Sequence, residues 1–368
     1  MKPLNPPQRV LMGPGPSDVD PAVLRAMAAP TIGHLDPAFL DVMDQTKAML
    51  RTLFGTSNDL TMPMSGTGSA GMETLMVNLI EPGDRVLVGV NGVFGTRMVE
   101  LARRCRAEVV VAEKPWGQAF TVEDLAAAGG DRSFRALFLV HAETSTGVLQ
   151  PLEGMRELCD RLGALLAIDC VTSLAGLPVE LDRHGVDAAY SGTQKCLSAP
   201  PGLSPISLSD RAFAHVLGRS TPVQSWYLDL SLIHRYWDEN TRAYHHTAPI
   251  NTIYALHEAC RLALDEGLEA RWARHRRLGG ALAAGLSDMG LNLPVAPDLR
   301  LPQLTVVEVP EGVDDKAVRG RLIRDYGLEI GGGLGAFAGK RWRIGLMGSA
   351  CTERNVLFCL SALREVLA

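Results

Sequence analysis

Between about residues 59 and 210 the chain alternates short apolar runs with stretches of helical periodicity. Several of the runs are apolar throughout, which is expected of strands covered by helices on both faces of a sheet. The strand-like runs are 60–62, 85–88, 108–111, 136–140, 164–168 and 204–208, and the helix-like stretches between them include 71–80, 95–104 and 152–162. This rhythm predicts an α/β fold with a mostly parallel, doubly wound sheet.

The pattern changes after residue 249. Residues 249–289 have helical periodicity, and we expect their charged positions, among them Arg261, Glu266, Arg271 and Arg274, to form a solvated face. Strand-like runs then return at 304–309 and 341–346, around helical stretches at 313–326 and 353–367. We therefore predict a large α/β domain at 17–256 and a small α+β domain at 257–368, joined by an N-terminal segment, 1–16.

Composition narrows the class of protein. Hydrophobic residues make up 46% of the 368 and charged residues 21%, as in ordinary globular proteins, and the net charge of -5 argues against a nucleic-acid partner. The seven cysteines are scattered without a CxxC pair, which fits a reducing compartment. The sequence contains no signal-peptide pattern, no apolar run long enough for a membrane span and no peroxisomal C-terminal tripeptide. We expect a cytoplasmic protein that does not contact membranes.

The first candidate for chemistry is the turn that runs from Ser65 to Glu73, which contains Thr67, Gly68 and Ser69. It follows a predicted strand and opens a predicted helix, where free backbone N–H groups and the helix dipole favour a phosphate. Glycine allows close approach of a ligand, and the two hydroxyls add donors. The alternative is an ordinary strand–helix turn capped by Thr67.

Asp169 and Lys195 are the next candidates. Asp169 directly follows the apolar run 164–168, and a carboxylate at the end of a buried strand is costly unless it has a partner, such as a protonated pyridine nitrogen. It is otherwise a cap of the following turn. Lys195 lies among small, polar and proline residues in 191–202. Desolvation lowers the pKa of such an amine and makes it a nucleophile for Schiff-base chemistry, although most lysines are solvated surface charges.

These three features occur in the order and sheet context that a pyridoxal 5'-phosphate (PLP) site requires. Here the sequence resembles the class V aminotransferases of the fold-type-I PLP superfamily, specifically alanine–glyoxylate and serine–pyruvate aminotransferases. The resemblance extends from residues 13–17 to 354–356. Its matching stretches include 81–84, 143–151, 190–201, 244–247 and 343–346. It implies a seven-stranded, mostly parallel sheet in the large domain.

The resemblance also implies a role for each matched residue. Lys195 forms an aldimine with PLP and then moves a proton, and Asp169 pairs with the pyridine nitrogen. Thr144 donates to the phenolic oxygen of the ring, and Val171 packs on one ring face. The residues implied to bind the phosphate are Thr67, Gly68, Ser69 and Gln194, with Tyr244 and Thr247 from the neighbouring subunit of a homodimer whose active sites are shared. Arg343 clamps the substrate carboxylate through two parallel hydrogen bonds.

Two positions depart from the mammalian pattern. Phe94 occupies the place of a tryptophan that stacks on the cofactor ring, and it lacks the indole N–H. Ser69 stands where a histidine is found.

The implied reaction is a ping-pong transfer of the amino group of alanine or serine to glyoxylate or pyruvate. The choice of donor, including serine–glyoxylate and (S)-ureidoglycine–glyoxylate transfer, stays open, because one methyl or hydroxyl changes discrimination by only about 1–3 kcal/mol. A β-lyase or cysteine desulfurase is an alternative that needs a nucleophilic thiol, for which Cys351 is the nearest candidate. A PLP-binding regulatory module is a third possibility. His245 and His246 would face opposite ways in an extended segment, and we expect no metal site.

Overall fold

The computed structural model describes residue 1 and residues 3–368. Its central feature is a seven-stranded sheet with the strand order β2-β10-β9-β8-β5-β3-β4. All neighbours pair in parallel except β10, which is antiparallel to both β2 and β9. The strands of this sheet are β2 (Leu60–Ser65), β3 (Arg85–Val90), β4 (Glu108–Glu113), β5 (Ala136–Val140), β8 (Leu165–Asp169), β9 (Ala188–Tyr190) and β10 (Leu203–Leu208). The predicted fold class, a mostly parallel seven-stranded sheet, is therefore confirmed.

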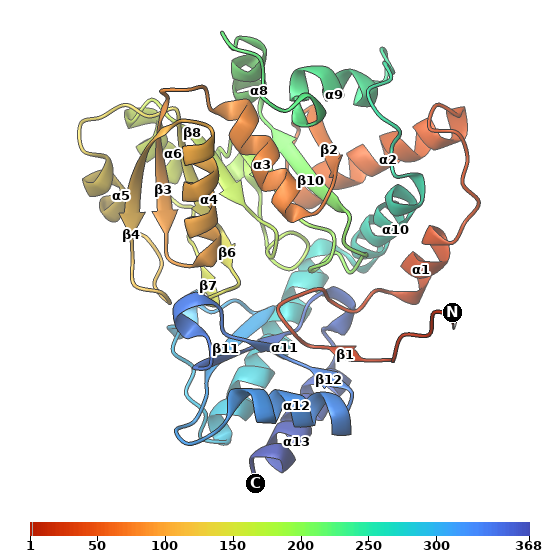
Figure 1. Ribbon diagram of the computed structural model, residues 1–368, viewed down its shortest axis with the longest axis vertical. Coiled ribbons are helices and arrows are strands. Elements are labelled where there is room, and N and C mark those ends of the chain that lie inside the picture. The colour runs from red at the N-terminus through yellow and green to blue at the C-terminus, as the bar shows by residue number, and fades with distance from the viewer. Residues whose placement is uncertain (2) are drawn as a thin grey trace.

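Helices cover the sheet, and α3 and α4 lie in front of it in Figure 1. The helices of this part are α1 (Pro21–Met27), α2 (Pro37–Phe54), α3 (Gly68–Leu79), α4 (Val93–Arg104), α5 (Val122–Gly129), α6 (Met155–Arg161), α7 (Leu181–His184), α8 (Asp210–Leu217) and α9 (Leu230–Trp237). Among the described residues, no helix combines the length and the apolar character needed to cross a membrane.

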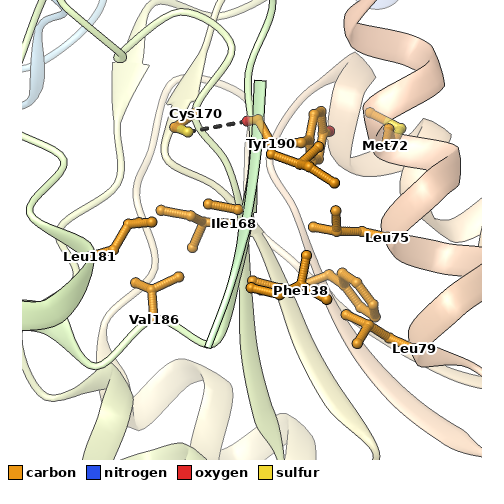
Figure 2. Close-up of a cluster of buried hydrophobic side chains, with 14 of the residues drawn as sticks. Met72, Leu75, Leu79, Phe138, Ile168, Cys170, Leu181, Val186 and Tyr190 are labelled. Carbon is orange, nitrogen blue, oxygen red and sulfur yellow. Dashed lines mark hydrogen bonds between the residues drawn. The ribbon is translucent and has the colours of Figure 1, made fainter. Parts of the chain in front are cut away.

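Apolar side chains are buried on both faces of the sheet, which explains why several of its strands are apolar at consecutive positions. In Figure 2, Leu75 and Leu79 of α3 lie on one side of the strands, and Ile168, Leu181 and Val186 lie on the other. All five side chains are buried. Removing such side chains from water stabilises the fold by about 1.5–3 kcal/mol each.

The C-terminal part has its own hydrophobic core beneath the large sheet (Figure 1). Trp342 lies fully buried in this core, and Met12 joins it from the N-terminal segment. Its elements are α11 (Leu268–Asp288), α12 (Asp315–Asp325), α13 (Glu353–Leu367), and the antiparallel sheet β11 (Leu304–Glu308), β14 (Arg341–Gly345) and β13 (Gly331–Gly332). The helix α10 (Ile250–Glu266) packs instead against α1 and α2 of the large part. The predicted boundary between residues 256 and 257 falls inside α10 and stays a prediction.

Two short two-stranded sheets complete the fold. The strand β1 (Val10–Leu11) pairs in parallel with β12 (Leu328–Glu329), which ties the N-terminal segment to the C-terminal part. The strand β6 (Ala142–Glu143) pairs with β7 (Val148–Leu149) just beyond the end of β5. The chain between them, 144–147, therefore lies at the carboxyl edge of the large sheet, where ligands of such sheets bind.

The charged face predicted on α10 and α11 is not wholly solvated. Arg271 is 6% exposed and donates to the backbone oxygens of Ala175 and Cys196, while Nη1 pairs with Glu266. The prediction was wrong for Arg271 because helical periodicity does not reveal which carbonyl groups a neighbouring loop will leave without partners.

Candidate active site

A cavity of about 240 Å³ opens at the carboxyl edge of the large sheet, next to the first turn of α3. The predicted cofactor-binding residues that line it are Thr67, Gly68, Ser69, Phe94, Thr144, Asp169, Val171, Gln194 and Lys195. Arg343 is not among its lining residues, and neither are Tyr244 and Thr247. The fold thus brings together most of the set that the sequence singled out from five separate segments.

Lys195 lies on the loop between β9 and β10, and its side chain is almost entirely buried. Its Nζ donates to the backbone oxygen of Pro14, and the Ser17 hydroxyl donates to the Lys195 carbonyl oxygen at 2.7 Å. Burial, with a smaller contribution from the Arg343 charge, lowers the pKa of Lys195 to about 8. A much larger fraction of this amine is therefore neutral and nucleophilic at physiological pH than of a solvated lysine.

The N-terminal segment packs directly on this amine. A Cβ added to Gly15 would lie 2.7 Å from both Cδ and Nζ of Lys195, and the φ of +106° at Gly15 disfavours any other residue. The backbone conformation therefore favours glycine here, and a larger residue would also displace the Lys195 side chain.

Asp169 ends β8 and is 3% exposed. Its Oδ1 accepts from the Val171 backbone N–H at 2.8 Å, and its Oδ2 accepts from the Tyr190 hydroxyl at 2.5 Å. Burial outweighs these hydrogen bonds and raises the pKa of Asp169 to about 6. The carboxyl group would hold its charge more readily beside a cation, which a protonated pyridine nitrogen supplies.

The turn before α3 leaves its donors free for an anion. Thr67 is the N-cap residue of α3, yet its side chain makes no capping hydrogen bond, so the structure does not support the alternative of an ordinary Thr67 cap. The amide oxygen of Gln194, which also lines the cavity, is buried without a hydrogen-bond partner among the described residues. The free helix N-terminus supplies donors for a phosphate group, and the NH2 group of the Gln194 amide, not its unpartnered oxygen, can donate to the same anion.

Phe94 is held in place from a neighbouring loop. It lies in the first turn of α4, where the N-cap is Gly92, which has no side chain to cap the helix. The buried Glu143 accepts from the Phe94 backbone N–H at 3.1 Å and from the Ser145 hydroxyl at 2.6 Å, and that hydroxyl accepts from the Val93 N–H at 2.9 Å. Burial raises the pKa of Glu143.

Arg343 lies beside the cavity wall on β14. Its Nε donates to the Gly332 backbone oxygen at 2.8 Å and its Nη1 to the Thr144 backbone oxygen at 3.4 Å. The side chain is buried, and burial lowers its pKa to about 10. Gly332 belongs to the short edge strand β13, which pairs with β14.

Tyr244 and Thr247 belong to the segment that precedes α10. Tyr244 is 60% exposed, and its hydroxyl lies 3.4 Å from that of Thr247. His245 and His246 do not face opposite ways, because this segment is not an extended strand, and their Nδ1 atoms lie 2.8 Å apart. Within the described residues there is no cluster of three or more His, Cys, Asp or Glu suited to a metal.

Sequence reasoning missed Tyr190 and Arg97, which both line the cavity. Tyr190 was hidden because β9 has only three residues and shows no clear apolar run. In the sheet register Tyr190 is the direct partner of Asp169, so a prediction of β9 would have placed its hydroxyl near the carboxylate. Arg97 follows Phe94 by three residues, a helical spacing that places both on one face of α4.

Comparisons with known proteins agree with this geometry. The family model "Aminotransferase class-V" matches residues 11–338. An alanine–glyoxylate aminotransferase of Oryctolagus cuniculus is 43% identical and is matched over 100% of this chain and 94% of its own length. An (S)-ureidoglycine–glyoxylate transaminase of Bacillus subtilis is 41% identical, over 98% of this chain and 91% of its own. A crystal structure of an alanine–glyoxylate aminotransferase from Nostoc sp. superposes with a TM-score of 0.97 at 49% identity, covering 100% of this chain and 97% of that one.

Proposed function

Because this chain belongs to the class V aminotransferases and is a PLP-dependent enzyme, we propose that it transfers the amino group of alanine or serine to glyoxylate or pyruvate. The observation that carries the proposal is the juxtaposition of a buried amine, Lys195, and a buried carboxylate, Asp169, in one cavity beside a free helix N-terminus. The relatives named for alanine and glyoxylate, matched along the whole chain, support the substrate class.

The residues that line the cavity fit PLP. When bound, PLP supplies an aldehyde that condenses with amines and a ring that accepts the electron pair released at the substrate Cα. Thr67, Gly68, Ser69 and Gln194 would hold its phosphate. Asp169 would keep a proton on the pyridine nitrogen, and Thr144 would donate to the phenolic oxygen.

The chain's own groups then account for the proton transfers. The Lys195 Nζ would act as the base that takes a proton from the substrate Cα and as the acid that returns it, since its lowered pKa places it near the working pH. Phe94 and Val171, which both line the cavity, would pack against the cofactor ring. Arg343 binds the substrate carboxylate through a planar guanidinium that matches two carboxylate oxygens.

A lyase or desulfurase mechanism finds no support at Cys351. Its side chain is fully buried in the C-terminal core and does not line the cavity. Burial raises its pKa to about 11, so the thiolate that such chemistry needs is suppressed.

We also propose a homodimer and a cytoplasmic location. A second copy of the chain would bring Tyr244 and Thr247 to the phosphate, and the exposed aromatic side chains of Trp226, Tyr227 and Tyr244 are consistent with a covered surface. The cytoplasmic proposal is supported by the seven cysteines, all of which are free and buried.

The decisive experiment mixes the PLP form of the enzyme with single amines and follows the loss of its visible absorbance. Alanine and serine are expected to discharge the absorbance, and glyoxylate or pyruvate to restore it, as in a ping-pong reaction. (S)-Ureidoglycine belongs in the panel, and a faster reaction with it would reassign the donor. Borohydride reduction is expected to label Lys195. Labelling of a different lysine, or wild-type turnover by Lys195→Ala, would refute the proposal, and turnover itself separates an enzyme from a regulatory module.

A further inference from the structure

Arg97 places a cation at the mouth of the cavity. Its Nη1 donates to the Ser69 hydroxyl at 3.2 Å, and its guanidinium carbon lies 5.0 Å from the centre of the Phe94 ring. All three residues line the cavity. The guanidinium therefore bridges the first turn of α3, where we place the phosphate, and the aromatic ring at the start of α4.

The charge of Arg97 has no acidic partner on its helix. The neighbouring Glu100 forms an ion pair with Arg104, whose Nε lies 2.8 Å from Glu100 Oε1. In the part of the chain that the structure describes, no Asp or Glu forms an ion pair with Arg97. Arg97 and Lys195 are the cationic side chains in the cavity lining. The aldehyde of bound PLP would engage Lys195, which would leave Arg97 as the cation of this lining that can meet an anion.

A phosphate ester is a strong anion, and the rest of its binding turn is uncharged. Thr67, Gly68, Ser69 and Gln194 offer hydroxyl, amide and backbone donors, and the helix N-terminus adds only a partial positive charge. A guanidinium carries several N–H donors, so it can hold Ser69 and a phosphate oxygen together. The ring of Phe94 limits the conformations of the Arg97 side chain and reduces the entropy lost on binding.

We propose that Arg97 is a cofactor-binding residue whose guanidinium donates to the phosphate group of PLP. The proposal rests on the assignment of this cavity to PLP made above. It states that Arg97 contacts the phosphate group of the cofactor and not its ring. Arg97 also supplies a charge on the side of the turn where Ser69 replaces the histidine of the mammalian pattern.

The test compares two aldehydes that differ only in the phosphate. The full-length protein, freed of cofactor, is titrated with PLP and separately with pyridoxal at low ionic strength, and binding is followed by absorbance. Arg97→Gln is expected to weaken PLP about tenfold, as for the loss of one charge-assisted hydrogen bond at a partly solvated site, and to leave pyridoxal unchanged. Arg97→Lys is expected to keep most of the PLP affinity. Added salt should narrow the gap between wild type and Arg97→Gln.

Arg103→Gln is the matched control, because it removes the same charge from an exposed position on another face of α4. It is expected to bind both aldehydes like the wild type. An equal loss of PLP and pyridoxal affinity in Arg97→Gln would overturn the proposal and leave Arg97 as a brace for Phe94. Unchanged PLP affinity with a raised KM for the oxo acid would also overturn it, by moving Arg97 to the substrate. A wild-type protein that binds neither aldehyde would instead refute the proposed function itself.

Discussion

Replacing Lys195 with methionine is expected to stabilise the cofactor-free protein at neutral pH while abolishing its activity. The amine is almost fully buried, and burial is the largest cause of the fall of its pKa from 10.5 to about 8. Between these two values the unfolded chain binds more protons than the folded one, so the stability of the wild type rises with pH in that window. Below pH 8 the folded protein carries the full cost of a desolvated ammonium group.

The size of the effect follows from the same two values. The fall from 10.5 to about 8 corresponds to roughly 3 kcal/mol at about 1.36 kcal/mol per pH unit. Methionine has a similar stem without charge, but it forfeits the hydrogen bond to the Pro14 carbonyl oxygen, at about 1 kcal/mol. A net gain of about 2 kcal/mol remains. With an unfolding entropy of about 2.1 cal/mol/K per residue, a chain of this length should melt roughly 2–3 °C higher.

The assay is thermal unfolding of cofactor-free protein at pH 7 and at pH 10. The advantage of Lys195→Met is expected at pH 7 and should shrink towards zero at pH 10, where the folded wild type has lost the ammonium proton. Titration of cysteines and tyrosines in the unfolded chain is common to both proteins and cancels in the comparison. Lys340→Met, at an exposed position, is the control and should show no such pH dependence. A variant less stable than wild type at pH 7, or an advantage that does not change with pH, would refute the buried-ammonium argument.

Three further variants test other parts of the site. Asp169→Asn removes the charge that would keep a proton on the ring nitrogen, and the single-turnover rate constant for an amino acid is expected to fall by about a hundredfold or more; a rate near wild type would show that the carboxylate is not needed. Gly92→Ala would place a Cβ 2.4 Å from the carboxyl carbon of Glu143, and the resulting shift of the α4 N-terminus should weaken PLP about tenfold in an absorbance titration; unchanged affinity would mean that the loop yields. Arg343→Lys keeps a charge but loses the two-pronged geometry, so KM for the oxo acid should rise about tenfold to a hundredfold with the PLP absorbance unchanged; a normal KM would place the carboxylate elsewhere.

The large sheet could be predicted from the sequence because its strands are buried on both faces. The run 136–140 is apolar at every position, and the structure assigns the same residues to β5 with every residue buried. By contrast, β9 consists of Ala188, Ala189 and Tyr190, a run too short to stand out. Strand pairing with β8 and β10, rather than local preference, makes these residues a strand. The hydrogen bond between Tyr190 and Asp169 depends on that register and was therefore not predictable from pattern alone.

The same distinction applies to the candidate site. Asp169 and the turn at Thr67 were predictable because each directly follows an apolar strand, and strand ends in parallel sheets meet at one edge. Glu143 gave no such signal, since its importance comes from the N-terminus of a helix that starts fifty residues earlier in the chain. Arg97 was passed over because nothing in the sequence distinguishes it from the solvated arginines that follow it on α4. A role in the site can be assigned to Glu143 or Arg97 only when the contacts between distant segments are known.

The ionisable side chains of the site are buried, and burial disfavours their charged forms. Burial lowers the pKa of Lys195 and of Arg343 and raises that of Asp169 and of Glu143, so it opposes the ionised form of all four. Hydrophobic burial elsewhere in the sheet must offset this cost. A cofactor whose aldehyde condenses with the neutral Lys195 amine and whose ring nitrogen is cationic beside Asp169 would relieve two of these costs, because the ammonium group is no longer present and the carboxylate gains a partner. The stabilisation expected from Lys195→Met measures the share of this cost that belongs to the amine.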